Sequence, residues 1–71
     1  MKITFKDKVI ELTQDAWYNN GRYQAAGVDA DGNVYNVFWD ILEGHEDDEW
    51  EDTMCDWDNP VMMVDEYGYE V

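Results

Sequence analysis

Positive charge is missing from most of this chain. Only four of its 71 residues are Lys or Arg, and none of them lies beyond Arg22. Eighteen residues are Asp or Glu, and fifteen of these follow Arg22, which gives a formal net charge of −14. Affinity for phosphate comes mainly from Lys and Arg, so nucleic acid is excluded as a direct ligand. Anionic lipid surfaces attract polybasic segments, so membrane binding is disfavoured by the same sign.

Other features are equally scarce. Cys55 is the only cysteine and cannot form an internal disulfide, which favours a reducing, cytoplasmic setting. No basic segment followed by an apolar stretch opens the sequence, so a secretory signal is not expected. No run approaches the roughly 20 apolar residues that span a bilayer.

What the chain does have is aromatic residues: four Trp, five Tyr and two Phe. Each can bury roughly 150–250 Å², which offsets the weak core of so short a chain. No internal repeat or linker divides the sequence. We therefore expect residues 1–71 to form one folded domain rather than a disordered chain.

Hydrophobic alternation predicts strands. Ile3 and Phe5, and then Ile10 and Leu12, indicate two short strands joined by a tight turn. Residues 13–20 are ambiguous between a helical turn and a strand, and we favour irregular or extended structure there.

The clearest local signal is a long hairpin. Two β-compatible runs, Tyr23 to Val28 and Val34 to Leu42, flank the loop 29–33, which is rich in Asp, Asn and Gly. The second run should bury one alternating face. That face comprises Tyr35, Val37, Trp39 and Ile41, and the small residues Ala25 and Gly27 would leave room for it.

Residues 43–58, which we call the acidic segment, hold nine carboxylates. Within it Trp50, Met54 and Trp57 have the i, i+4, i+7 spacing of one helical stripe, which predicts a short helix between about Asp47 and Cys55. A final strand over Val61 to Val64 and a turn or bulge over 66–69 complete the chain. The predicted fold is a β-rich α+β domain, a small antiparallel sheet or partly open barrel of four or five strands with one short acidic helix.

Candidate chemical sites are weak. Residues 29–33 resemble the start of a calcium loop, but the sixth position is Val34, the twelfth is Asp40 and no helices are expected to flank it, so a plain turn is favoured. Carboxylates around Cys55 would keep its thiol protonated, so Cys55 is expected to be buried and His45 to be a solvated loop residue rather than a nucleophile pair. We expect no enzyme activity, no metal and no cofactor.

The acidic segment is the main functional candidate. Its charge exceeds the magnitude of about 2–8 that solubility requires of a small domain. Its carboxylates are interleaved with Trp50 and Trp57, which can be either binding hot spots or anchors that fasten the segment to the sheet.

In size, charge and acid–aromatic interleaving across Tyr23 to Val71, the chain resembles small acidic inhibitors encoded by phages and mobile elements, especially DNA-mimic anti-restriction and anti-CRISPR proteins. The resemblance is not a sequence motif. It implies a non-enzymatic inhibitor in the bacterial host cytoplasm, monomeric or weakly dimeric, whose carboxylates stand where DNA phosphates would stand. The implied partner is a basic nucleic-acid-binding protein, a CRISPR effector or a restriction enzyme subunit.

We therefore predict a partner-binding surface centred on the acidic segment, with the hairpin tip as a second cluster and Phe38 as a further contact. Two other classes stay open: an immunity protein or antitoxin that neutralises a basic toxin, and an assembly protein that pairs through a strand edge. The predicted binding residues are Glu46, Asp47, Asp48, Glu49, Trp50, Glu51, Asp52, Asp56, Asp58, Asp29 and Asp31.

Overall fold

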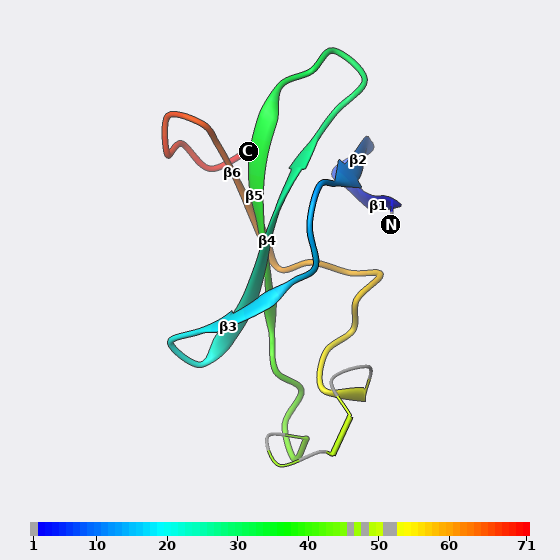
Figure 1. The fold of residues 1–71 in the computed structure, drawn as a ribbon, viewed down its shortest axis with the longest axis vertical. Coiled ribbons are helices and arrows are strands. Elements are labelled where there is room, and N and C mark those ends of the chain that lie inside the picture. Colours follow the sequence, from blue (N-terminus) through cyan, green and yellow to red (C-terminus); the bar gives the residue numbers. More distant parts are fainter. Residues whose placement is uncertain (1, 46, 48, 51–52) are drawn as a thin grey trace.

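The computed structural model describes residues 2–45, 47, 49–50 and 53–71. These form one antiparallel sheet of six strands that does not close (Figure 1). The strand order is β1-β2-β4-β5-β6, with β3 also paired to β4. The strands are β1 (Lys2–Phe5), β2 (Lys8–Leu12), β3 (Trp17–Asn19), β4 (Arg22–Val28), β5 (Val34–Asp40) and β6 (Met62–Asp65).

The predicted antiparallel sheet is confirmed. β4 and β5 form the long hairpin, in full register from Arg22 opposite Asp40 to Val28 opposite Val34. β1 and β2 form the predicted short hairpin. There are six strands rather than four or five because residues 17–19, expected to be irregular or extended, pair with the start of β4 while β2 pairs with its end.

Tight turns fix two of the hairpins. Asn20 and Gly21, between β3 and β4, have φ of 53° and 85°, as the favoured two-residue hairpin turn requires. Lys6 and Asp7, between β1 and β2, adopt φ of 48° and 67° in the same left-handed region without a glycine. The first hairpin therefore carries backbone strain that the second avoids.

The inner face of the sheet forms the core. Tyr35, Val37 and Trp39 of β5 are buried, as predicted, while Ile41 lies beyond the end of the strand and is half-buried. Ala25 and Gly27 lie on the same face of β4. A Cβ at Gly27 would stand 2.6 Å from Ile10 Cγ2, so the space there is occupied by the β1–β2 hairpin rather than by the aromatics of β5.

The predicted helix between Asp47 and Cys55 is wrong for the described residues, which contain no helix. Turns and bends replace it, including a turn in which the Thr53 amide donates to the Trp50 carbonyl (3.3 Å). The three side chains of the expected stripe do not share a face: Met54 is buried, Trp57 is half-buried and Trp50 is 68% exposed. Glu51 and Asp52 lie outside the described residues.

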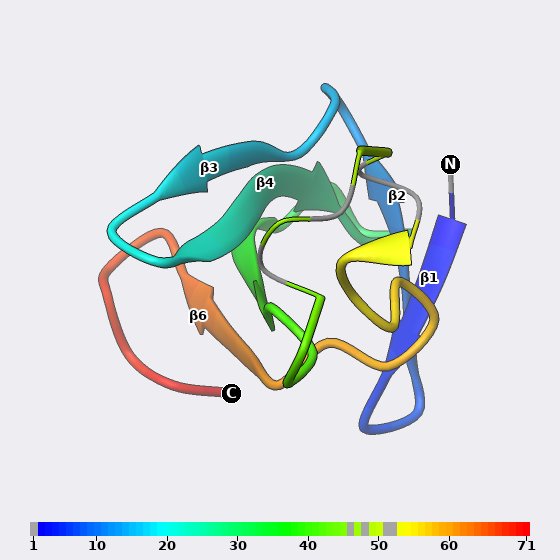
Figure 2. The same ribbon diagram turned by 90° about the horizontal axis from the view of Figure 1, so that it is seen from below.

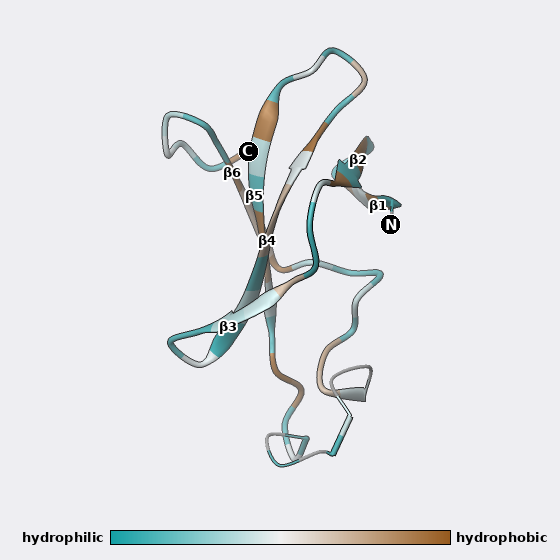
Figure 3. Ribbon diagram, viewed as in Figure 1, coloured by the Kyte–Doolittle hydropathy of each residue, from teal (hydrophilic) through white to brown (hydrophobic). Residues whose placement is uncertain are grey.

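The connection between β5 and β6 packs against the sheet, which explains why its described residues form a loop rather than the predicted helix. The Leu42 amide donates to the Met54 carbonyl (2.7 Å), and Met54, Cys55 and Trp57 join the core group. Figure 2 looks along the long axis and shows that the sheet is curved. Hydrophobic colour lies mainly on the strands and hydrophilic colour mainly on the loops (Figure 3). The connection thus folds as a loop that dips into the concave side of the sheet.

Candidate binding surface

The hairpin tip is organised by Asp29. Its Oδ1 accepts hydrogen bonds from the amides of Asp31 and Asn33 (both 2.9 Å), and its Oδ2 accepts from Asn33 Nδ2 (3.1 Å) and the Tyr35 hydroxyl (3.0 Å). The Asn33 side-chain bond, with those from the Asn33 amide, Tyr35 and Asp31, lowers the pKa of Asp29 from 3.8 to about 2. Asp29 is therefore a fixed anion at neutral pH.

These bonds also bear on the calcium-like pattern. Both carboxylate oxygens of Asp29 already serve the turn, while Asp31 is exposed. Among the residues that the structure describes, no group of three or more His, Cys, Asp and Glu is arranged to hold a metal ion.

A second loop repeats the arrangement. Asp65 Oδ1 accepts from the amides of Tyr67 and Tyr69 (both 2.9 Å), and the Gly68 amide donates to the Asp65 carbonyl (3.0 Å), as Gly32 does to Asp29 (3.1 Å). Both loops share the spacing Asp-x-x-Gly. Because Tyr35 pairs with Asp65 across β5 and β6, the two loops lie at the same end of the sheet.

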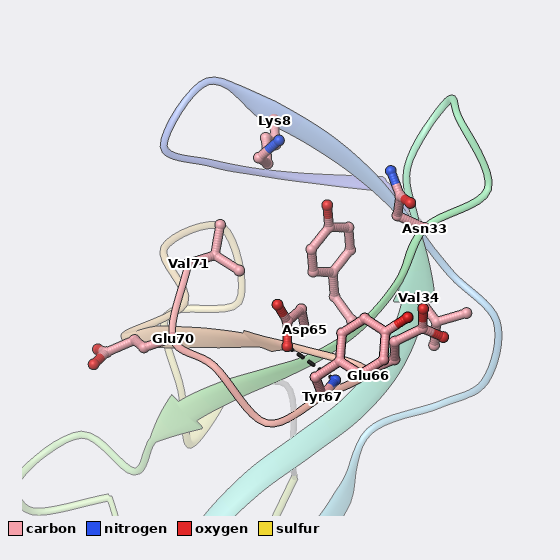
Figure 4. A pocket seen from close by; sticks show the side chains of 9 residues that line it. Lys8, Asn33, Val34, Asp65, Glu66, Tyr67, Glu70 and Val71 are labelled. Carbon is pink, nitrogen blue, oxygen red and sulfur yellow. Dashed lines mark hydrogen bonds between the residues drawn. The ribbon is translucent and has the colours of Figure 1, made fainter.

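We call residues 29–33 and 65–70 the tip surface. Beside these loops lies an open pocket of about 440 Å³, which we call the tip pocket (Figure 4). Its lining includes the buried Tyr35 and Tyr67, which is 78% exposed. Burial, followed by the bond to Asp29, raises the pKa of Tyr35, so its phenol stays protonated.

Two cations of the first hairpin approach this region: Lys8 lines the pocket, and Lys6 Nζ donates to the Val71 carbonyl (2.9 Å).

Three carboxylates of this pocket were not among the predicted binding residues. The repeated Asp-x-x-Gly spacing was the signal that could have indicated a second ordered acidic loop. Its adjacency to the hairpin tip depends on strand pairing and could not be read locally. The missed residues are Asp65, Glu66 and Glu70.

The predicted residues of the acidic segment are exposed where they are described. Asp47, Glu49 and Trp50 face solvent. Asp56 and Asp58 are also exposed, and Asn59 Nδ2 donates to Asp56 Oδ2 (2.9 Å). The remaining predicted residues, Glu46, Asp48, Glu51 and Asp52, lie outside the described residues.

The two tryptophans of the acidic segment have separate roles. Trp57 is an anchor, because its ring lies 5.2 Å from that of Trp39 and 5.3 Å from that of Tyr23, and its carbonyl accepts from Trp39 Nε1 (3.0 Å). Trp50, 68% exposed, is a surface residue. The sequence left open whether each tryptophan is a core anchor or a surface residue, and in the structure Trp57 is the anchor and Trp50 lies at the surface.

Cys55 and His45 are the two other residues of the acidic segment whose surroundings were predicted from the sequence. Cys55 is buried, as predicted, and burial together with the charge of Asp40 raises the pKa of its thiol. His45 is half-buried in the turn after β5, where its amide donates to the Leu42 carbonyl (3.0 Å), so the expectation of a solvated side chain is only partly met.

The hairpin tip, predicted as a second cluster, lies apart from the acidic segment. The loop 29–33 stands at one end of the long axis, and the described part of residues 43–53 stands at the other (Figure 1). The molecule extends 37 Å along that axis. The described carboxylates of loop 29–33 and of residues 43–53 therefore lie at opposite ends of the molecule.

Ion pairing between the described residues is sparse. The one ion pair formed between two described residues joins Arg22 to Asp40 (3.0 Å), at the end of the β4–β5 hairpin. The other three cations belong to the first hairpin. The acidic segment has no Lys or Arg of its own.

No family model, no curated protein and no solved structure matches the chain. Within the described residues, no helix has the length and apolar character needed to cross a bilayer.

Proposed function

We propose that the protein is a non-enzymatic inhibitor that occupies the nucleic-acid groove of a bacterial defence protein, a CRISPR effector or a restriction enzyme subunit. The observation that carries the proposal is the placement of exposed carboxylates at both ends of a 37 Å molecule. One turn of B-DNA spans about 34–36 Å, so the two ends match phosphates roughly one turn apart. The choice of a defence protein rests on the resemblance.

The mechanism is competitive. Phosphate contacts from Lys and Arg supply most of the non-specific affinity of a DNA-binding groove, and fixed carboxylates can take over those contacts. Asp65 is oriented by hydrogen bonds to its Oδ1 before binding, so little ordering cost remains for it. The net charge of −14 accelerates encounter with a basic groove.

Two local features supply short-range contacts. Trp50 projects from the acidic segment and can lose its exposed surface against the partner. At the other end, the tip pocket combines Tyr67 with the carboxylates of Asp65 and Glu66, a setting that suits an Arg or Lys side chain through ion pairing and cation–π contact.

The first experiment identifies the partner. Tagged protein is incubated with bacterial lysate at low and high salt, and captured proteins are identified by mass spectrometry. We expect a basic nucleic-acid-binding protein that is released by salt and displaced by duplex DNA. Capture of a toxin at its active-site rim would support the immunity-protein alternative, and recovery of no basic protein at low salt would contradict both.

A matched pair of variants then tests the surface. The triple change Asp47→Asn, Glu49→Gln and Asp58→Asn removes three of the nine carboxylates of the acidic segment, whereas Asp7→Asn, Glu11→Gln and Asp15→Asn removes the same charge elsewhere. The first should lose most inhibition and the second should keep it. Equal losses would mean that net charge alone, rather than the placement of carboxylates, governs binding.

A further inference from the structure

The outer face of the sheet has a different character from the two acidic ends. Antiparallel register places Trp17, Gln24, Phe38 and Met62 side by side in one row across β3, β4, β5 and β6. The next rows add Ala26, Asn36 and Val64, and then Val28 and Val34. Most of the centre of this face is therefore apolar, and it includes two aromatics and a methionine.

These side chains are not part of the packed core on the other face of the sheet. Phe38, Met62 and Val64 belong neither to the buried core nor to the half-buried residues packed against it. All three are only half-buried, although they lie on interior or paired strands. A sheet ordinarily buries its apolar face against a second layer.

Charge is arranged around this face rather than within it. At one end Arg22 is paired to Asp40 and lies over the Phe38 ring, 5.9 Å from its centroid. Glu11 and Glu70 stand at its margins, opposite Val28 and Val64. An apolar centre enriched in Trp, Phe, Met and Arg with a charged rim has the composition of a protein–protein interface.

We propose that this outer face is the contact between two copies of the chain in a symmetric dimer. A basic partner is attracted to the acidic ends of the molecule and finds no unpaired carboxylates among the described residues at the centre of the outer face. A second copy, by contrast, can approach a body of charge −14 with least repulsion through this nearly neutral face. Gln24 and Asn36 carry both donors and acceptors, so the face can satisfy an identical face across a twofold axis.

The electrostatics give the dimer a distinctive salt dependence. Like charges on the two copies repel, and the repulsion is screened as the Debye length falls from about 30 Å at 0.01 M to about 3 Å at 1 M salt. Self-association should therefore strengthen with salt. Binding of a basic target through the acidic ends should weaken with salt, so either inference can fail without the other.

Sedimentation velocity of the full chain at low and high salt, up to millimolar protein, tests the proposal. We expect a monomer–dimer equilibrium whose dissociation constant falls at least severalfold at high salt. A purely monomeric protein at both salt concentrations, or association that weakens with salt, would overturn the outer-face dimer.

Charge-reversing variants locate the contact. Phe38→Glu and Val64→Glu should abolish the dimer at high salt, whereas Tyr18→Glu, which adds the same charge on the opposite face of the sheet, should not. Thermal unfolding followed by circular dichroism verifies that each variant is folded, and Val34→Glu, at a 41% exposed position, replaces any that is not. Dimerisation unchanged by all outer-face variants would refute the assignment.

Discussion

The Tyr35 hydroxyl donates to Asp29 Oδ2 at 3.0 Å and ties the hairpin tip to a side chain buried on the inner face of the sheet. One carboxylate therefore connects the exposed tip surface to the core. The same carboxylate has a pKa of about 2, below its usual 3.8, mainly through its bond from the Asn33 side chain.

This lowered pKa predicts a pH-dependent contribution to stability. The folded chain holds the Asp29 proton less tightly than the unfolded chain, so the stabilisation is complete above about pH 4 and is lost as pH falls towards 2. In Asp29→Asn this component should vanish.

The variant must be compared with a charge-matched control, because acid also relieves repulsion among the other carboxylates. Asp31→Asn removes the same charge at the same tip from an exposed side chain. Urea unfolding from pH 5 to 2 should show that the Asp29→Asn curve differs in slope from wild type below pH 4, while the Asp31→Asn curve follows it. Parallel curves for all three proteins would contradict the role of Asp29.

The two tryptophans of the acidic segment should respond in opposite ways to truncation. Trp57→Ala should lower the free energy of unfolding by about 3 kcal/mol, because it removes ring contacts to Trp39 and Tyr23. Trp50→Ala should change it by less than about 0.5 kcal/mol but weaken partner binding. Urea unfolding and the capture experiment measure the two effects. A destabilised Trp50→Ala protein would show that Trp50 packs onto the domain.

Gly27 sits where the first hairpin meets the long one. In Gly27→Ala the added Cβ would lie 2.6 Å from Ile10 Cγ2 and 2.9 Å from the Glu11 carbonyl oxygen, so we expect a loss of about 1–3 kcal/mol. Gly32→Ala is the control for backbone cost, because its Cβ meets nothing within 4 Å although φ is 83°. Thermal denaturation compares them. A Gly27→Ala protein as stable as wild type would mean that the β1–β2 hairpin can move away freely.

The strained turn between β1 and β2 offers a stabilising change. Asp7 has φ of 67°, and a left-handed conformation costs an ordinary L-residue about 1–2 kcal/mol that glycine avoids. Asp7→Gly should therefore stabilise the protein by about 1 kcal/mol in urea unfolding. Asp7→Asn removes the same charge without the same freedom and should give a smaller gain. An equal gain from both would assign the effect to charge.

The strands were predictable because their signals are local. Alternation over residues 34–40 and the Asp, Asn and Gly content of the loop 29–33 identified the long hairpin and its buried face. The short strand at 17–19 was harder, because all three of its residues are exposed and its pairing with β4 supplies the order.

The helix was mispredicted for a physical reason. The spacing of Trp50, Met54 and Trp57 fits a helical stripe, but two of these residues contact the core from a loop and one faces solvent. Spacing alone cannot distinguish a helix from a loop that dips into the concave side of a sheet. The tip pocket arises from pairing between β5 and β6, which are far apart in sequence.

The connection between β5 and β6 also bears on how the chain folds. β6 joins the sheet only after residues 41–61 have been brought back on themselves, and this stretch contains all nine carboxylates of the acidic segment. Closing such a loop carries an entropic cost and crowds like charges before Trp57 contacts Trp39. Because counterions screen the repulsion within this loop, we expect the protein to refold faster as the ionic strength rises.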